Sequence, residues 1–297
     1  WIFDEAFSRE DIRNWLLACR RTTPTAFRFR TYHAGFDSVY GIGIVPAGDG
    51  AGPAEFAYRI DGRRLVLEAT NISQFILSGD SMPREIRSLA PAPAGSIPVR
   101  LFEKNTVPAT KQPHGPIKQA FLEPFAFVCT ADPTNSAGLA EFQGRCREWY
   151  RFAKADPRTL YECNINSNRL SEFNVFIFGE PEKSALLREV IAQSPVEITE
   201  DTYRIGDAVI PRKGNGLYMV RPSPWNPAKL AVVQCGIPWG LELPENHKYD
   251  LLPDYIIYSG ETDSDGSNHA LCVGFFTPGW QLDLRLMTLQ PLEPVTF

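Results

Sequence analysis

The stretch NVFIF (residues 174–178), followed by GEPEKS (residues 179–184), decides how this sequence folds. Four of its first five residues are apolar, and such an unbroken run is typical of a β-strand buried on both faces. Gly179 and Pro181 then turn the chain, and a helix is expected from Ser184 to Ile191. The stretch therefore predicts a strand, a tight turn and a helix, which is the repeating element of a sheet with parallel strands.

Strands and helices alternate on both sides of this stretch. The spacing of apolar residues predicts a helix from Leu139 to Ala153, with the basic residues Arg145, Arg147 and Arg151 mostly off its apolar stripe. Gly206-Asp207 signals a hairpin. Further strands are expected at residues 125–129, 217–220, 230–234 and 255–258. The alternation predicts a three-layer α/β domain over residues 113–297, with a mostly parallel sheet.

The first 112 residues show two other patterns. Trp15 and Leu16 belong to the apolar stripe of a helix expected over residues 8–20, and this stripe needs a partner in another domain or in a part of the protein outside this sequence. From about residue 25 the apolar period becomes two, with turn residues between short strands. We therefore expect an N-terminal helix in residues 1–24, a β-sandwich over 25–112 and the α/β domain over 113–297.

The composition is that of an acidic, folded protein. Apolar residues make up 43 % of the chain, and 30 Lys and Arg against 35 Asp and Glu give a net charge of −5. This balance argues against nucleic acid as a partner. No apolar run approaches the roughly 18 residues of a spanning helix, so we expect no membrane span.

No motif for a metal or a cofactor is present. The six cysteines contain no CxxC pair, and the four histidines form no HExxH or HxH pair. The chain also lacks a P-loop and a GxGxxG turn after a strand. We therefore expect neither a metal nor a nucleotide cofactor, while the disulfide state of the cysteines stays open.

The candidate ligand site follows the strand at 174–178. In an open sheet with parallel strands, loops at the carboxyl ends of the strands line the ligand crevice, and a helix N-terminus can hold an anion. The candidate ligand-binding residues are Gly179, Glu180 and Ser184, together with Trp225. The simpler alternative is that Gly179 and Pro181 form a tight turn and that Ser184 caps the helix.

Aromatic loops suggest a second kind of site. Trp225, Trp239 and Trp280 lie in loops rich in proline and glycine, and such aromatic rings can stack on sugar rings. The structural alternative is that these tryptophans fill domain junctions. A glycan-binding module is therefore one alternative function.

Gly79-Asp80-Ser81 suggests a third possibility, an independent GDS-type esterase that uses Ser81. That chemistry needs a histidine general base, usually on a late Asp-x-x-His. Asp265 and His269 are one residue too far apart for this motif, and the chain has no Gly-x-Ser-x-Gly elbow. The sequence therefore predicts no complete catalytic set on this chain.

Four stretches together resemble one known region. They are GPIKQAF with the following PF (residues 115–125), NVFIFGEPEKS (174–184), YMVRPSPWNP with the later VV (218–233), and LPDY with GFF and a tryptophan (252–280). In this order they resemble the C-terminal accessory region of bacterial prolyl-oligopeptidase-like α/β-hydrolases, a family of serine peptidases and esterases. Glu180 stands where that region usually has Asp, and Pro224-Trp225 stands where it has Pro-Leu.

The resemblance implies a non-catalytic role. In the family, a β-rich segment separates the hydrolase domain from a Rossmann-like accessory domain, and the helix at residues 8–20 resembles the last helix of the hydrolase domain. The catalytic Ser, Asp and His of the family would all lie upstream of Trp1. The implied partners are an upstream hydrolase domain or subunit and a peptide or glycan substrate, and the implied location is secreted or periplasmic.

Overall fold

The computed structural model describes residues 8–20, 24–31, 38–47, 53–61, 64–78, 99–102, 113–243, 248–250, 252–277 and 279–290. The chain divides into two compact units. The N-terminal unit comprises most of the chain up to Asn105, and the C-terminal unit comprises most of the chain from Thr106 onward. Ser81, His33 and His247 lie outside the described residues, as does most of the boundary between the second and third predicted regions.

The N-terminal unit contains one described helix and two sheets. The helix α2 (Glu10–Ala18) buries none of its residues, and Trp15 and Leu17 are 66 % and 74 % exposed. One sheet has the order β1 (Ala26–Thr31), β4 (Ala54–Asp61), β5 (Arg64–Thr70). The other has the order β2 (Ser38–Val39), β3 (Ile42–Pro46), β6 (Ile72–Ser78), β7 (Val99–Phe102). Phe56 of the first sheet packs on Phe75 of the second, with ring centroids 5.5 Å apart, so aromatic rings join the two sheets.

A sheet of eight strands organises the C-terminal unit. Its strands in spatial order are β18 (Leu282–Leu289), β17 (Asn268–Phe276), β16 (Tyr255–Thr262), β14 (Asn215–Ser223), β15 (Asn226–Gly236), β10 (Asn174–Phe178), β8 (Phe125–Cys129) and β9 (Thr159–Tyr161). Neighbouring strands from β15 to β9 are parallel, and the other pairs are antiparallel. A small antiparallel sheet comprises β11 (Val196–Ile198), β12 (Thr202–Ile205) and β13 (Ala208–Pro211).

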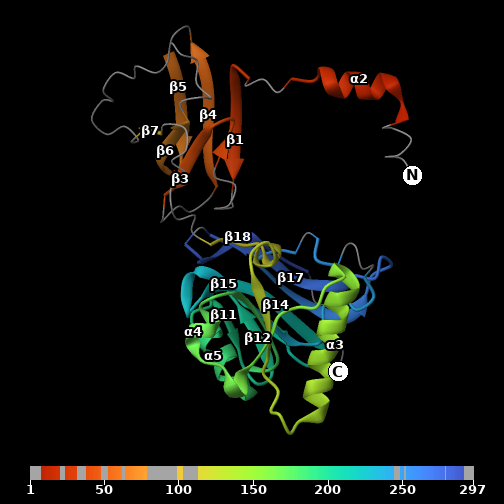
Figure 1. Cartoon of the computed structure of the whole chain (residues 1–297). Helices are drawn as coiled ribbons and strands as arrows, with labels where there is room; N and C mark the ends of the chain where they lie inside the picture. Colours follow the sequence, from red (N-terminus) through yellow and green to blue (C-terminus); the bar gives the residue numbers. More distant parts are fainter. Residues whose placement is uncertain are drawn as a thin grey trace. The chain divides into compact units, whose positions relative to one another are not determined.

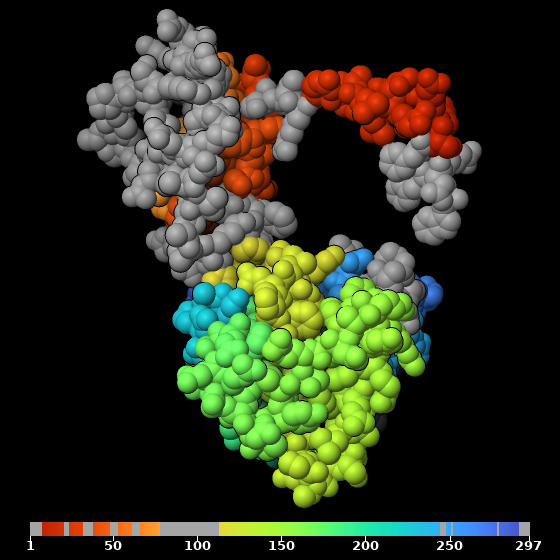
Figure 2. Space-filling view, in the orientation of Figure 1, coloured from red at the N-terminus to blue at the C-terminus, as the bar shows by residue number. Residues whose placement is uncertain are grey.

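Helices cover the large sheet. They are α3 (Ser136–Ala153), α4 (Ser167–Leu170) and α5 (Ala185–Ile191), with short 3-10 turns η2 (Ile117–Phe121), η3 (Glu162–Asn164) and η4 (Pro181–Lys183). In Figure 1, α3 lies on one side of β14 and β15, and α4 and α5 lie on the other. One side of α3 (yellow-green) forms part of the surface of this unit in Figure 2. The helix predicted over residues 139–153 is thus confirmed, as is the hairpin at Gly206-Asp207, which joins β12 and β13.

The predicted fold class is wrong. Strands hold 45 % of the described residues and helices 22 %, so this is a β-rich fold with a large mixed sheet. It is neither a three-layer α/β domain with a mostly parallel sheet nor Rossmann-like. The physical reason is that short connections join neighbouring strands in this half of the sheet and make them antiparallel. β14 turns directly back into β15, and β16, β17 and β18 follow one another as antiparallel neighbours. Apolar runs identify strands but do not give their direction.

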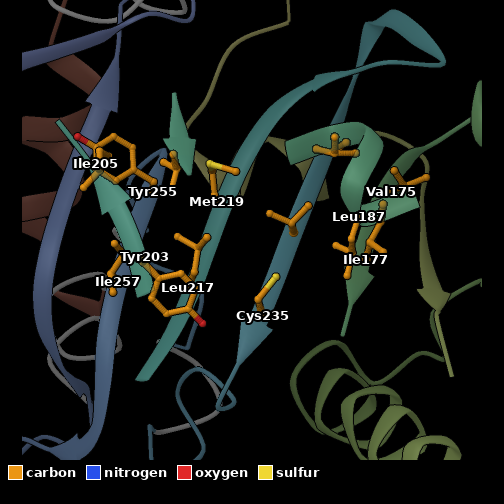
Figure 3. Packing of buried hydrophobic residues seen from close by; sticks show 14 of the residues in the cluster. Val175, Ile177, Leu187, Tyr203, Ile205, Leu217, Met219, Cys235, Tyr255 and Ile257 are labelled. Atoms are coloured by element: carbon orange, nitrogen blue, oxygen red, sulfur yellow. The ribbon is translucent and has the colours of Figure 1, made fainter. Parts of the chain in front are cut away.

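The core lies on both faces of the large sheet. Val175 and Ile177 point into one cluster of buried side chains, and Phe176 between them points into the other. Figure 3 shows Val175 and Ile177 beside Leu187 of α5 in the first cluster. All three β10 side chains are fully buried, which confirms the prediction of a strand buried on both faces.

Candidate functional site

A crevice of about 400 Å³ opens at the carboxyl ends of the parallel strands. The chain leaves β8 for α3 and leaves β10 for α5, and these helices pack on opposite faces, Phe142 of α3 in one cluster and Leu187 of α5 in the other. Adjacent parallel strands whose connections leave in opposite directions create a crevice between them, and this is the position where open sheets bind ligands. We call this cavity the crevice.

The crevice is lined by charged, polar and aromatic side chains. They include Asp132, Glu141, Phe142, Arg145, Glu162, Cys163, Phe178, Glu180, Lys183 and Gln234. Of the predicted site residues, Gly179 and Glu180 line it, and Ser184 and Trp225 do not. Two of the four predicted residues therefore lie at the crevice and two lie elsewhere.

Arg145 is the most unusual group of the crevice. Its side chain is 7 % exposed, and its Nη2 donates to Oε1 of Glu141 over 3.4 Å, while Glu141 itself is 65 % exposed. This is the only hydrogen bond that the side chain of Arg145 makes to a described residue. The guanidinium carbon lies 5.8 Å from the centre of the Phe178 ring. A bond of this length is weak, so a buried cation faces the crevice with most of its donor capacity unused.

A second buried cation lies close to the first. Lys248 donates to Oε2 of Glu148 over 3.1 Å, and both side chains are largely buried. Burial lowers the pKa of Lys248, and the nearby positive charge of Arg145 lowers it as well. Lys248 and Glu148 line a small neighbouring cavity rather than the crevice. Because Glu148 is bonded to Lys248, it supplies no counter-charge to Arg145.

Glu162 supplies a buried acceptor. Its Oε1 accepts from the backbone N–H of Leu186 at the start of α5 over 3.1 Å. Its Oε2 is buried and has no hydrogen-bond partner among the described residues. An unsatisfied buried carboxylate oxygen is costly, and a donor from a ligand would relieve that cost.

The loop after β10 is held in place by close packing and by ion pairs between side chains. Gly179 has φ of +144°, and a Cβ on it would lie 2.2 Å from Oγ1 of Thr130. Glu180 accepts from the backbone N–H of Gly236 over 2.9 Å and pairs with Arg212. Arg212 also pairs with Glu182 and lowers the pKa of that carboxyl. Glu180 therefore fixes the wall of the crevice and is already occupied by protein partners.

Ser184 and Trp225 have structural contacts elsewhere. The Oγ of Ser184 is buried and accepts from the backbone N–H of Leu187, so Ser184 is the N-cap of α5, as the simpler alternative predicted. Trp225 lies in the turn between β14 and β15, at the amino end of β15 and away from the crevice. Its Nε1 donates to Glu189 over 3.1 Å.

The other loop tryptophans are engaged within the fold. Trp239 is largely buried, donates to the backbone oxygen of Lys248 and packs on Tyr258 with ring centroids 5.0 Å apart. Trp280 packs against Phe276. Their rings are therefore used for internal packing, which weakens the argument for sugar stacking on these residues.

The described lining of the crevice contains no histidine and no serine. Its hydroxyl and thiol groups belong to Thr130, Cys129 and Cys163. Thr130 donates to the backbone oxygen of Phe178, and burial raises the pKa of the Cys129 thiol. An activated nucleophile needs the opposite shift or an adjacent base, so the described geometry suits binding rather than acyl transfer.

His269, the histidine of the candidate esterase motif, has a different carboxylate neighbour from the one that the motif suggests. His269 lies 3.4 Å from Asp263 on the surface, so its carboxylate neighbour is not Asp265. All six cysteines are free thiols. The described residues contain no group of three or more His, Cys, Asp or Glu side chains placed to hold a metal ion.

Asp254, which lies outside the crevice, is a described carboxyl group whose pKa is strongly raised. It is buried, and its Oδ2 accepts from the backbone N–H of Phe276 over 2.8 Å. Burial raises its pKa to about 7, against the opposing effects of that hydrogen bond and of the Arg221 charge. Asp254 lies beside Val220 near the end of β14, which runs antiparallel to β15, so it lies toward the sheet edge opposite the crevice.

Arg145 lies on the buried face of α3, although the sequence pattern predicted the basic residues of this helix mostly off its apolar stripe. Phe142, Arg145 and Trp149 are spaced three and four residues apart, which puts them on one helix face. All three are buried. An arginine at a stripe position is the signal that was available in the sequence.

Comparison with protein-family models, with curated proteins and with solved structures finds no match for this chain. The resemblance to the hydrolase accessory region therefore stays a prediction. None of the described helices is both long and apolar enough to cross a membrane.

Proposed function

We propose that this chain is a non-catalytic accessory region of a larger α/β-hydrolase of the serine peptidase or esterase class, and that its C-terminal unit binds a small ligand in the crevice. The accessory role rests on the sequence resemblance, and the observation that carries the ligand-binding part is the buried Arg145, which faces the crevice with one long hydrogen bond to an exposed carboxylate. A buried charge without a close partner is costly, and such groups concentrate at functional sites.

The absence of an activated nucleophile in the described lining supports the non-catalytic part. A ligand held there would regulate or orient the substrate of a catalytic domain elsewhere. Secretion follows from the same resemblance and belongs to the same proposal.

The exposed stripe of α2 supports the accessory part. Trp15, Leu16 and Leu17 all lie on the surface of a nine-residue helix that buries nothing against the described residues. Exposed apolar side chains in such a group are typical of an interaction surface. In this proposal the stripe packs on the hydrolase domain.

A fluorophosphonate probe, which labels activated serines, tests the non-catalytic assignment. We expect no labelling of this chain on its own, and labelling of Ser81 or of any other serine would overturn the assignment. The intact mass and peptide map of the native polypeptide test the accessory assignment. We expect a hydrolase segment with a Gly-x-Ser-x-Gly elbow, joined to the chain or bound to it, and its absence from both would contradict the proposal.

A further inference from the structure

We infer that the crevice binds a small zwitterion, an amino acid or a short peptide, with its carboxylate on Arg145 and its ammonium group toward the acidic residues of the lining. The inference rests on the proposed ligand-binding function and names the ligand class. It follows from the arrangement of charge in the crevice, whose lining contains the buried Arg145 together with several carboxylates.

Arg145 favours an anionic ligand. Its side chain is buried, its ion-pair partner Glu141 is exposed, and the nearby Glu148 is bonded to Lys248 outside the crevice lining. A guanidinium binds a carboxylate through two parallel hydrogen bonds, and its strength increases when water is excluded. A carboxylate on Arg145 would give the guanidinium a closer partner than the exposed Glu141.

The acidic residues of the crevice lining favour a cation or an N–H donor on the ligand. The lining contains Asp132, Glu141, Glu162 and Glu180 against the cations Arg145 and Lys183. Glu180 is paired with Arg212, but Oε2 of Glu162 is buried with no described partner. A ligand ammonium or amide N–H would satisfy that oxygen.

The same charges select against other small ligands. A phosphate dianion would gain from Arg145 but would be repelled by the surplus of carboxylates. A neutral sugar would leave Arg145 with the long contact to the exposed Glu141 as its counter-ion. The rings of Phe142 and Phe178 add an apolar surface, which favours a ligand with an apolar side chain.

Isothermal titration calorimetry of the full chain with the dipeptide Ala-Phe measures the affinity and tests the inference directly. Two analogues each remove one charge: Ala-Phe amide lacks the carboxylate, and N-acetyl-Ala-Phe lacks the ammonium. We expect each analogue to bind at least about 10-fold more weakly than the free dipeptide, since each loses one charged hydrogen bond. Equal binding of all three would overturn the inference.

Variants identify the site. Arg145→Gln should weaken binding of the free dipeptide at least about 10-fold, whereas Arg147→Gln, an exposed position on the same helix, should leave it unchanged. Glu162→Gln should narrow the difference between the free and the N-acetylated dipeptide. If Arg145→Gln does not fold, protection of Arg145 from phenylglyoxal by the dipeptide in the wild-type chain replaces it, and no protection would contradict the inference.

The inference and the proposed function fail in different ways. If inorganic phosphate binds in an Arg145-dependent manner and the free dipeptide does not, the ligand class is wrong while the crevice remains a ligand site. If the free dipeptide, phosphate and free phenylalanine all fail to bind, the ligand-binding function itself is contradicted.

Discussion

The central strands of both halves of the large sheet are buried, but the connections that follow the strands differ between the two halves. In the parallel half, from β15 to β9, the connections leave by way of helices on opposite faces, and the strand ends open into the crevice. In the antiparallel half the strands continue into their neighbours through turns. The two buried arginines differ as well, since the Arg145 side chain has one long bond, whereas Arg221 donates to the backbone oxygens of Gln193 and Trp280. The comparison shows that the connections between strands, rather than their apolar content, decide where a ligand site can form.

The largest expected loss of stability comes from a substitution in the core of the large sheet. Phe176 of β10 is fully buried and stacks on Phe121 with ring centroids 4.2 Å apart. Phe176→Ala should reduce the free energy of unfolding by about 3–5 kcal/mol, through lost burial and the cavity left behind. Leu284→Ala on the edge strand β18, where the side chain is 52 % exposed, should cost less than about 1 kcal/mol. Equal losses in urea denaturation would contradict the burial pattern.

The next effect concerns the buried acid of the antiparallel half. The pKa of Asp254 in the folded state is about 7, above the value of about 3.9 for an unfolded aspartate. The stability contributed by neutral Asp254 is therefore fully present below about pH 4 and is lost as the pH rises through 7, by up to about 4 kcal/mol.

Asp254→Asn removes this titration and gives the matched control. Relative to the wild type, the variant should gain stability as the pH rises from 4 to 8, because the amide does not ionise. Urea denaturation at several pH values measures the difference. A difference that stays constant with pH would show that burial does not raise this pKa.

A smaller effect tests the wall of the crevice. Gly179→Ala places a Cβ against Thr130 at a positive φ, and it should destabilise the fold by about 1–3 kcal/mol. Gly144→Ala in the middle of α3 is its counterpart, because a Cβ there meets nothing closer than 3.8 Å. This second change should stabilise the chain by about 0.5–1 kcal/mol. Opposite shifts of the thermal midpoint are expected, and shifts of the same sign would contradict the geometry of the loop.

The smallest expected loss of stability distinguishes residues that stabilise the loop after β10 from residues that bind the ligand. Ser184→Ala removes the N-cap of α5 and should cost about 1 kcal/mol of stability. Because Ser184 does not line the crevice, titration with Ala-Phe should give the same affinity for this variant as for the wild type. A loss of affinity comparable to that of Arg145→Gln would return Ser184 to the binding site.

Local structure could be predicted from the sequence where one physical signal dominates. The run at 174–178 identifies a doubly buried strand, and the Ser184 side chain identifies a helix start. Strand direction could not be predicted, because apolar runs of β15 and β16 have the same composition whether they pair in parallel or antiparallel. Arg145 was placed off the apolar stripe by its charge, although its spacing from Phe142 and Trp149 puts it on the buried face.

The most direct measurement of the central claim is a map of backbone amide shifts in the ¹⁵N–¹H spectrum during titration with Ala-Phe. We predict saturable shifts at residues around the crevice, above all Gly179, Gly236 and the N-terminal half of α3. Gly206 and Gly266, which do not line the crevice, should stay unshifted. Saturable shifts confined to the antiparallel half, or none at all, would contradict the claim that the parallel half carries the ligand site.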